Sequence, residues 1–152
     1  MKKTLLPLLL IVVAVTAYLL WPSDESRISK LFKEAAKAAE TKEVEGIMAK
    51  ISYRYSDDYG MSYLLLKEQL KAQFKSLSDI RVEYEDMKIA PSGDTANVDL
   101  KLRVVATLGA ETGYILGDLK TPLTLRITLE KERAKWLITR VERAGGNGPP
   151  GP

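Results

Sequence analysis

The sequence predicts an α+β domain in which helices come first and an antiparallel sheet follows. Between residues 23 and 77 the apolar residues recur at spacings of three and four, as on one face of a helix. From residue 80 to 142 they alternate with polar residues, as on one face of a strand. About 120 residues lie between an apolar N-terminus and a Gly/Pro-rich end, which is enough for one domain with one core.

Residues 1–22 predict a membrane-spanning segment. Lys2 and Lys3 precede an uncharged run, residues 4–21, which as a helix is about 27 Å long, close to the ~30 Å hydrocarbon core of a bilayer. The two lysines predict a cytoplasmic N-terminus, so the domain is expected on the extracytoplasmic side of a bacterial cell membrane, with a single pass. The alternative is a signal peptide cleaved near Ala17, which leaves a secreted or periplasmic domain.

Three amphipathic helices are predicted after this segment. The first begins at Ser23 or Asp24, because either side chain can accept a hydrogen bond from a free amide of the first turn. A short second helix covers 42–51, and a third begins after Ser62. Their apolar faces are expected in the core: Ile28, Leu31, Phe32, Ala35 and Ala39, then Val44, Ile47, Met48 and Ile51, then Tyr63, Leu66, Leu70, Phe74 and Leu77.

Strict alternation then predicts a curved antiparallel sheet. The runs 96–108 and 122–130 are apolar at every second position and mostly polar between, so we expect a sheet that is covered on one face. Residues 80–89 form a strand before them, and a hairpin leads into the last strand, 136–142. The inward positions of the two longest strands are all aliphatic: Ala96, Val98, Leu100, Leu102, Val104, Ala106, Leu108, Leu123, Leu125, Ile127 and Leu129.

The composition excludes several functions. Histidine and cysteine are absent, which removes Ser-His-Asp and Cys-His nucleophiles, thiol redox chemistry, disulfides and His/Cys zinc sites. The formal net charge is only +3, and the basic residues are interspersed with acids, which argues against a nucleic-acid partner. No cofactor and no metal site is predicted, because Asp57 and Asp58 offer too few oxygens for Ca²⁺, which takes about 6–8.

The order of elements, with the closing strand "WLITRVE", resembles the nuclear transport factor 2-like superfamily. This resemblance covers about residues 24 to 143, a domain that we place at 23–143, and is nearest to small exported bacterial members. It implies a cystatin-like fold, in which a bent sheet wraps a long helix into a cone. The superfamily includes ketosteroid isomerase, scytalone dehydratase and many binding or accessory domains. The isomerase implies a tyrosine and two acids in the cone and the dehydratase implies histidines, so no catalytic residue is carried over.

Asp86, with Tyr84, is the candidate for catalysis. Alternation along 80–89 puts both residues on the inward face, but the apolar phase switches at Met87. One interpretation is a buried Asp86 with a raised pKa that serves as a general base. The other, which we favour, is a β-bulge at Glu85 and Asp86, which leaves both carboxylates in solvent.

Candidate binding residues lie in two connections. The segment "ISYRYSDDYG", residues 51–60, either closes the cone with its tyrosines or only packs at the turn between the second and third helices. The long connection 109–122 forms an extra strand, a lid on the cone or a patch that faces a partner. The residues in question are Tyr53, Tyr55, Tyr114, Ile115 and Leu116.

Together these features predict a membrane-anchored, non-enzymatic binding or accessory domain for an apolar small molecule or an envelope protein. The aliphatic lining favours this reading, because a catalytic cone needs a polar group, although the same lining suits a closed core. The alternatives are an isomerase- or dehydratase-like enzyme that uses a carboxylate and a tyrosine, and a structural module that forms a homodimer. Residues 144–152 predict a disordered Gly/Pro tail.

Overall fold

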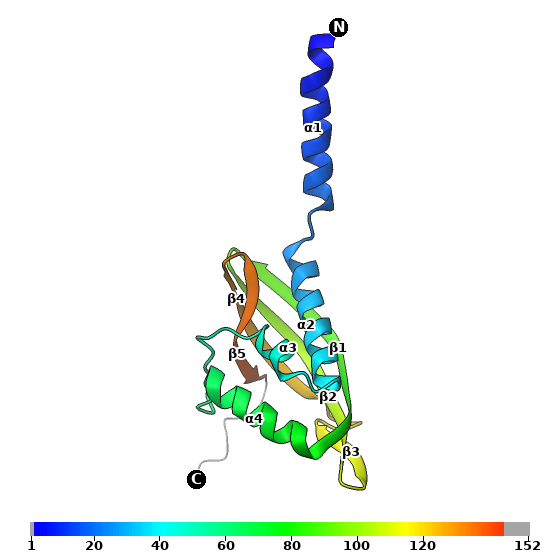
Figure 1. The fold of residues 1–152 in the computed structure, drawn as a ribbon, viewed down its shortest axis with the longest axis vertical. Coiled ribbons are helices and arrows are strands. Elements are labelled where there is room, and N and C mark those ends of the chain that lie inside the picture. The colour runs from blue at the N-terminus through cyan, green and yellow to red at the C-terminus, as the bar shows by residue number, and fades with distance from the viewer. Residues whose placement is uncertain (1, 145–152) are drawn as a thin grey trace.

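The computed structural model describes residues 2–144, with side chains from Leu6 onward, so the tail predicted over 145–152 lies outside the described residues. Helix α1 (Lys2–Leu20) projects from one end of the remaining fold (Figure 1). Every large apolar side chain of α1 from Leu6 onward is at least 50% exposed. From Leu6 onward, where side chains are described, no single helix is long and apolar enough to span a membrane, although 6–20 and 24–40 meet that standard together as a pair bent by 41°.

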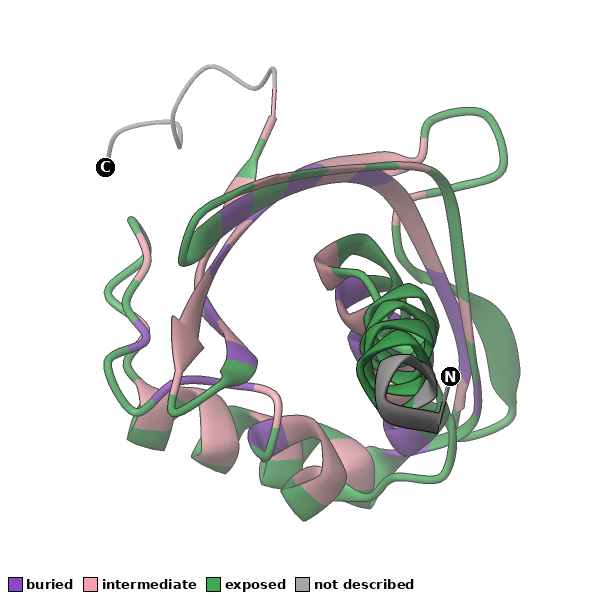
Figure 2. Cartoon of the chain, turned by 90° about the horizontal axis from the view of Figure 1, so that it is seen from above, coloured by how far each residue is buried: buried purple, intermediate pink, exposed green. Residues whose placement is uncertain are grey.

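Helix α2 (Asp24–Glu40) follows after three residues. The Ser23 hydroxyl accepts a hydrogen bond from the Ser26 amide at 3.1 Å, which confirms Ser23 as the N-cap. Figure 2 shows the sheet curving around this helix. The apolar face of α2 buries Ile28, Leu31 and Phe32 in the core beside the sheet, and Ala38 is buried next to Gly46 of the following helix.

The second predicted helix is shorter than expected. Helix α3 (Val44–Met48) ends before the predicted boundary at 51. The cause is backbone pairing with the last strand: the Ile138 amide donates to the Lys50 carbonyl, and the Ser52 amide donates to the Ile138 carbonyl. A helix cannot continue where its backbone groups bond to a strand.

The third predicted helix is confirmed as α4 (Tyr63–Ser76). The Ser62 hydroxyl accepts a hydrogen bond from the Leu65 amide at 3.4 Å, as expected of an N-cap. No residue of α4 is fully buried, but its apolar stripe packs against the core through half-buried side chains. These are Tyr63, Leu66, Leu70 and Phe74.

The sheet is antiparallel throughout, with the order β1-β2-β4-β5. Strand β2 is shared by two neighbours on one side: residues 95–102 pair with β4, and residues 104–108 pair with β3. The extra strand was one of the alternatives for the connection 109–122. The strands are β1 (Leu77–Ser92), β2 (Thr95–Leu108), β3 (Glu111–Leu116), β4 (Leu123–Glu132) and β5 (Lys135–Arg143).

The core lies between the concave face of the sheet and the helices. All but one of the inward aliphatic positions are buried or half-buried; the exception is Leu108, 57% exposed, which ends β2 where the chain turns. The fully buried Val98 and Leu129 meet Ile28 and Met48 from the helices. The helices therefore fill this part of the cone, and the α+β class with helices on an antiparallel sheet is confirmed.

Candidate functional site

The catalytic candidates Asp86 and Tyr84 lie outside the packed interior. The pairing of β1 with β2 shifts between Glu85 and Lys88, and Asp86 has a φ of 53°, so the favoured bulge is confirmed. The Asp86 side chain is 62% exposed and pairs with Lys101 at 3.0 Å. The interpretation that placed Asp86 inside the cone is therefore wrong, because the bulge turns this carboxylate to the outer side.

Tyr84 is 36% exposed. It borders an open groove of about 940 Å³ along the outer side of α2, whose other lining residues are mostly polar, such as Ser29 and Lys33. Asp86 does not supply a base beside Tyr84, because its carboxylate pairs with Lys101. The two candidates thus do not form a common site.

The segment 51–60 is built as a structural turn. The Asp57 carboxylate accepts hydrogen bonds from the amides of Tyr59 and Met61 and from the Tyr55 hydroxyl, at 2.9–3.0 Å. Tyr55 is 5% exposed, and burial, together with the neighbouring Asp57 carboxylate, raises the pKa of its phenol. Asp57 therefore orders the loop, as an aspartate does in an Asx turn.

Tyr53 does not share this environment. It is 84% exposed and its ring lies 4.6 Å from that of Tyr63. The segment joins α3 to α4 as expected, but only one of the two tyrosines packs into the fold. No group of three or more acidic side chains that could hold a metal ion occurs among the described residues.

The connection 109–122 presents apolar side chains to solvent. Every residue of β3 is exposed, and Tyr114, Ile115 and Leu116 are each 40–43% exposed. Leu119, in the loop that follows, is 71% exposed. These residues lie at the end of the domain far from α1 (Figure 1). The structure thus places Tyr114, Ile115 and Leu116 on the surface in strand β3.

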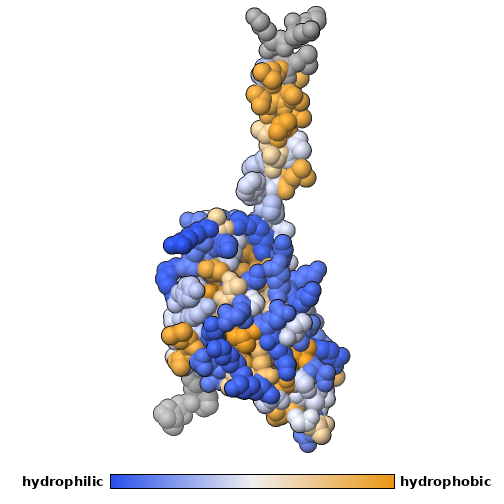
Figure 3. Space-filling model, viewed as in Figure 1, coloured by the Kyte–Doolittle hydropathy of each residue, from blue (hydrophilic) through white to orange (hydrophobic). Residues whose placement is uncertain are grey.

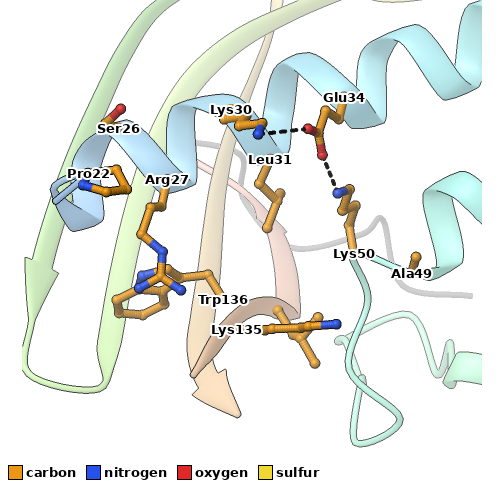
Figure 4. Close-up of a pocket in the computed structure, with 11 residues that line it drawn as sticks. Pro22, Ser26, Arg27, Lys30, Leu31, Glu34, Ala49, Lys50, Lys135 and Trp136 are labelled. Carbon is orange, nitrogen blue, oxygen red and sulfur yellow. Dashed lines mark hydrogen bonds and ion pairs between the residues drawn. The ribbon is translucent and has the colours of Figure 1, made fainter. Parts of the chain in front are cut away.

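A cavity of about 530 Å³ lies at the opposite end, beside the start of α2. Three segments that are distant in sequence meet there: the start of α2, the end of α3 with the residues after it, and the start of β5 (Figure 4). We call it the junction cavity. Its lining residues are Pro22, Ser26, Arg27, Lys30, Leu31, Glu34, Ala49, Lys50, Lys135, Trp136 and Leu137.

The junction cavity is basic. Four cationic side chains line it against one carboxylate, Glu34. Lys50 donates a hydrogen bond to Glu34, and the Lys30 ammonium lies 3.7 Å from the same carboxylate. The hydrogen bond from Lys50 and the charge of both lysines hold the pKa of Glu34 below its usual range, so Glu34 is ionised at neutral pH.

A second carboxylate ties α2 to the β4–β5 hairpin behind the cavity. Asp24 accepts a hydrogen bond from the Trp136 indole at 3.0 Å and pairs with Lys131 at 3.2 Å. These interactions, led by the indole hydrogen bond, lower the pKa of Asp24. Trp136 is 5% exposed, and Lys131 lies over its ring at 4.9 Å. Asp24 and Lys131 therefore fix the position of Trp136, which forms part of the cavity wall.

Sequence reasoning missed the junction cavity. Its cations are spread over positions 27 to 135 and are interspersed with acids, so they form no local motif. The one local feature in the sequence is Trp136 at the start of the last strand, and this tryptophan is interpreted there only as part of the closing strand "WLITRVE". The parallel pairing of residue 51 with β5 joins two of the segments, and the contacts of Asp24 with Trp136 and of Lys50 with Glu34 bring in α2.

No protein-family model and no curated protein sequence matches this chain. Its fold is nevertheless similar to solved structures. An NTF2-like protein with a cystatin-like fold from Novosphingobium aromaticivorans superposes with a TM-score of 0.64 at 16% identity, over 90% of each chain. A candidate scytalone dehydratase from the same organism gives a TM-score of 0.66 at 14% identity, over 76% of this chain and 78% of its own.

Bd1075 of Bdellovibrio bacteriovorus gives a TM-score of 0.63 at 16% identity over 77% of this chain, which spans only 40% of the length of Bd1075. At these identities the likeness concerns the fold and not the activity. The element order, the sheet that curves around α2 and these superpositions agree. The chain has a cystatin-like fold, like that of the NTF2-like structure on which it superposes.

Proposed function

We propose that this protein is a membrane-anchored, extracytoplasmic binding domain without enzymatic activity. The observation that carries the proposal is the exposure of α1: each of its large apolar side chains from Leu6 to Leu20 is at least half exposed. Figure 3 shows this apolar helix standing clear of a largely hydrophilic domain. Such a surface is unfavourable in water and favourable in a bilayer.

The length and the ends of this segment support a single pass. Counted from Lys2, and so with the four residues that precede Leu6, the 19 residues of α1 give about 28 Å of helix, near the ~30 Å of bilayer hydrocarbon. Tyr18 lies in the last turn of α1 and Trp21 comes directly after it, with 82% and 73% of their surface exposed, as suits side chains of the headgroup region. Lys2 and Lys3 favour a cytoplasmic N-terminus.

The exposed residues also favour an anchor over a cleaved signal peptide. Cleavage near Ala17 would leave Tyr18, Leu19, Leu20 and Trp21 as the new N-terminus, each 73–82% exposed. An apolar end of this kind costs free energy in water unless the membrane or a partner covers it. An uncleaved chain keeps these four residues in the bilayer.

A binding role is favoured over catalysis by the nature of the interior. The cone is filled by aliphatic and aromatic side chains from both layers, and the one carboxylate proposed as a base faces solvent. Among the described residues, the enzyme alternative therefore has no acid and base pair in the core. Binding is supported at the junction cavity, and the exposed apolar residues of 109–122 suit contact with an envelope protein.

Membrane topology tests the proposal. The chain has no cysteine, so Lys120→Cys gives a unique thiol on an exposed loop. In bacterial spheroplasts we expect a membrane-impermeant maleimide to label this thiol, and the full-length chain of 16.9 kDa to stay in carbonate-washed membranes. As the matched control, a cysteine added before Met1 should be labelled only after lysis. A chain that is released by carbonate at full length, or labelled at Lys120→Cys only after lysis, would refute the anchored topology.

A further inference from the structure

The cations of the junction cavity are not equally engaged. Arg27 donates to the Ala134 carbonyl and lies 3.7 Å from Asp24, and Lys50 donates to Glu34. Lys30 shares Glu34 only at 3.7 Å with 76% of its side chain exposed. Lys135 is exposed and makes no ion pair within the part of the chain that the structure describes. Two lysines are thus free to turn toward an anion.

The positive charge of the cavity exceeds what its own carboxylate can neutralise. Glu34 stands alone against four cations in the lining. Figure 4 shows Glu34 between Lys30 and Lys50, while Arg27 extends from α2 toward Trp136 and Lys135 extends from β5. A phosphate group presents several acceptor oxygens at once and so suits convergent donors of this kind.

The floor of the cavity is apolar. Leu31 and Trp136 are 6% and 5% exposed, and Leu137 and Pro22 complete the lining. A volume of about 530 Å³ is several times that of a bare phosphate and falls in the range of small-molecule sites. The combination suits a phosphate ester that carries a carbon-containing group, because the ester part can cover the apolar floor.

The position of the cavity points to the source of such a ligand. Pro22 and Ser26, at the start of α2, line its wall, and α1 ends at Leu20. If α1 spans the bilayer, the cavity opens beside the layer of lipid headgroups. Basic side chains gain binding energy near a bilayer surface that carries anionic lipids, about 1 kcal/mol for each lysine or arginine.

We propose that the junction cavity binds the phosphate group of an anionic phospholipid headgroup from the membrane that holds α1. This inference rests on the proposed anchoring for the source of the ligand, but the phosphate chemistry depends only on the cavity. Lys30 and Lys135 bind the phosphate oxygens, Arg27 and Lys50 supply fixed positive charge, and Trp136 with Leu31 covers the ester carbons.

Tryptophan fluorescence offers a direct test. The chain has two tryptophans, and Trp21→Phe leaves Trp136, in the cavity wall, as the single reporter. The full-length variant in uncharged detergent is titrated with dihexanoyl phosphatidylglycerol, with dihexanoyl phosphatidylcholine and with inorganic phosphate. We expect a saturable change in Trp136 emission with phosphatidylglycerol, a weaker one with inorganic phosphate and none with zwitterionic phosphatidylcholine.

A pair of double variants separates the cavity from general surface charge. Lys30→Gln/Lys135→Gln removes the two mobile cations, and we expect the Kd for phosphatidylglycerol to rise about 25-fold, from roughly fivefold for each lysine. Lys75→Gln/Lys120→Gln removes the same charge from the far end of the domain, where both side chains are exposed, and should leave the Kd unchanged.

The possible outcomes contradict different parts of the proposal. An equal loss in both double variants, or no saturable change with phosphatidylglycerol, overturns the proposed site. Equal affinity for inorganic phosphate and phosphatidylglycerol overturns the assignment to lipid. Because binding is measured in detergent, it does not depend on insertion of α1: a chain that binds phosphatidylglycerol but fails carbonate extraction overturns the anchor, and one that stays in the membrane but does not bind overturns the site.

Discussion

Three glycines of the connection 109–122 provide a graded test of how this strand is attached to the sheet. Gly117 has a φ of +66°, and a Cβ built on it would lie 2.7 Å from the Leu102 carbonyl oxygen and 3.0 Å from the Leu123 amide nitrogen. Gly109 has a similar φ of +64° but nothing within 4 Å of its Cβ position. Gly113 has an ordinary φ and equally open surroundings. The three sites therefore separate backbone conformation from steric contact.

The expected losses follow from these differences. Gly113→Ala should change the free energy of unfolding by no more than about 0.5 kcal/mol, as at an ordinary surface site. Gly109→Ala should lose roughly 1–2 kcal/mol, the cost of a left-handed conformation for a residue with a Cβ. Gly117→Ala should lose this amount and a further ~1–3 kcal/mol, because the atoms that clash belong to the backbone and cannot rotate away. This clash can be relieved only if the backbone of the paired residues Leu102 and Leu123 shifts.

Urea unfolding of the full-length protein in a Trp21→Phe background and uncharged detergent, followed by Trp136 fluorescence, measures these losses. We expect the unfolding midpoint to fall in the order Gly113→Ala, Gly109→Ala, Gly117→Ala, with unchanged slopes. If Gly117→Ala proves no less stable than Gly109→Ala, the close approach of the loop to β2 and β4 is wrong. If Gly113→Ala lowers the free energy of unfolding as much as the other two variants, the positive φ of Gly109 and Gly117 is not the cause of their losses.

Two pH dependences follow from the shifted pKa values. The pKa of Asp24 is lowered, so its contribution to stability is present above the unfolded value near 3.8 and is lost as the pH falls through the folded value. The melting temperature of Asp24→Asn should therefore fall less than that of wild type below about pH 4, and an equal fall contradicts the assigned contact with Trp136. The pKa of Tyr55 is raised, so its contribution is present below the unfolded value of 10.0 and is lost as the pH rises through the folded value. The native phenolate absorbance change near pH 10 should thus be the same in Tyr55→Phe as in wild type, and loss of one tyrosine's share from that change would contradict the burial of Tyr55 beside Asp57.

The sequence predicted the features of the fold that depend on local patterns. Ser23 and Ser62 mark the starts of α2 and α4, because a capping hydroxyl before an apolar periodic run is a local signal. Alternation located β2 and β4, and the phase switch in 80–89 located the bulge at Asp86. Each of these features is written in residues that are neighbours along the chain.

Features that depend on distant pairing were not predictable in the same way. Helix α3 stops early because residues 50–52 bond to β5, about 85 residues further along the chain. Leu108 alternates like a core residue, yet it is exposed because β2 ends there. The junction cavity depends on the same contact with β5, so its residues carried no joint signal. Whether Tyr53, Tyr114, Ile115 and Leu116 bind a partner stays a prediction.

The short length of the link between α1 and α2 also determines how high an affinity for lipid the junction cavity needs. Residues 21–23 extend at most about 10 Å, too short to let the domain drift away from the bilayer in which we propose α1 to lie. A tether of this reach replaces an encounter in solution by one at an effective concentration of millimolar or more. A weak intrinsic affinity for lipid is then enough to keep the junction cavity occupied. Because the affinity is weak, the bound lipid exchanges rapidly with the bilayer.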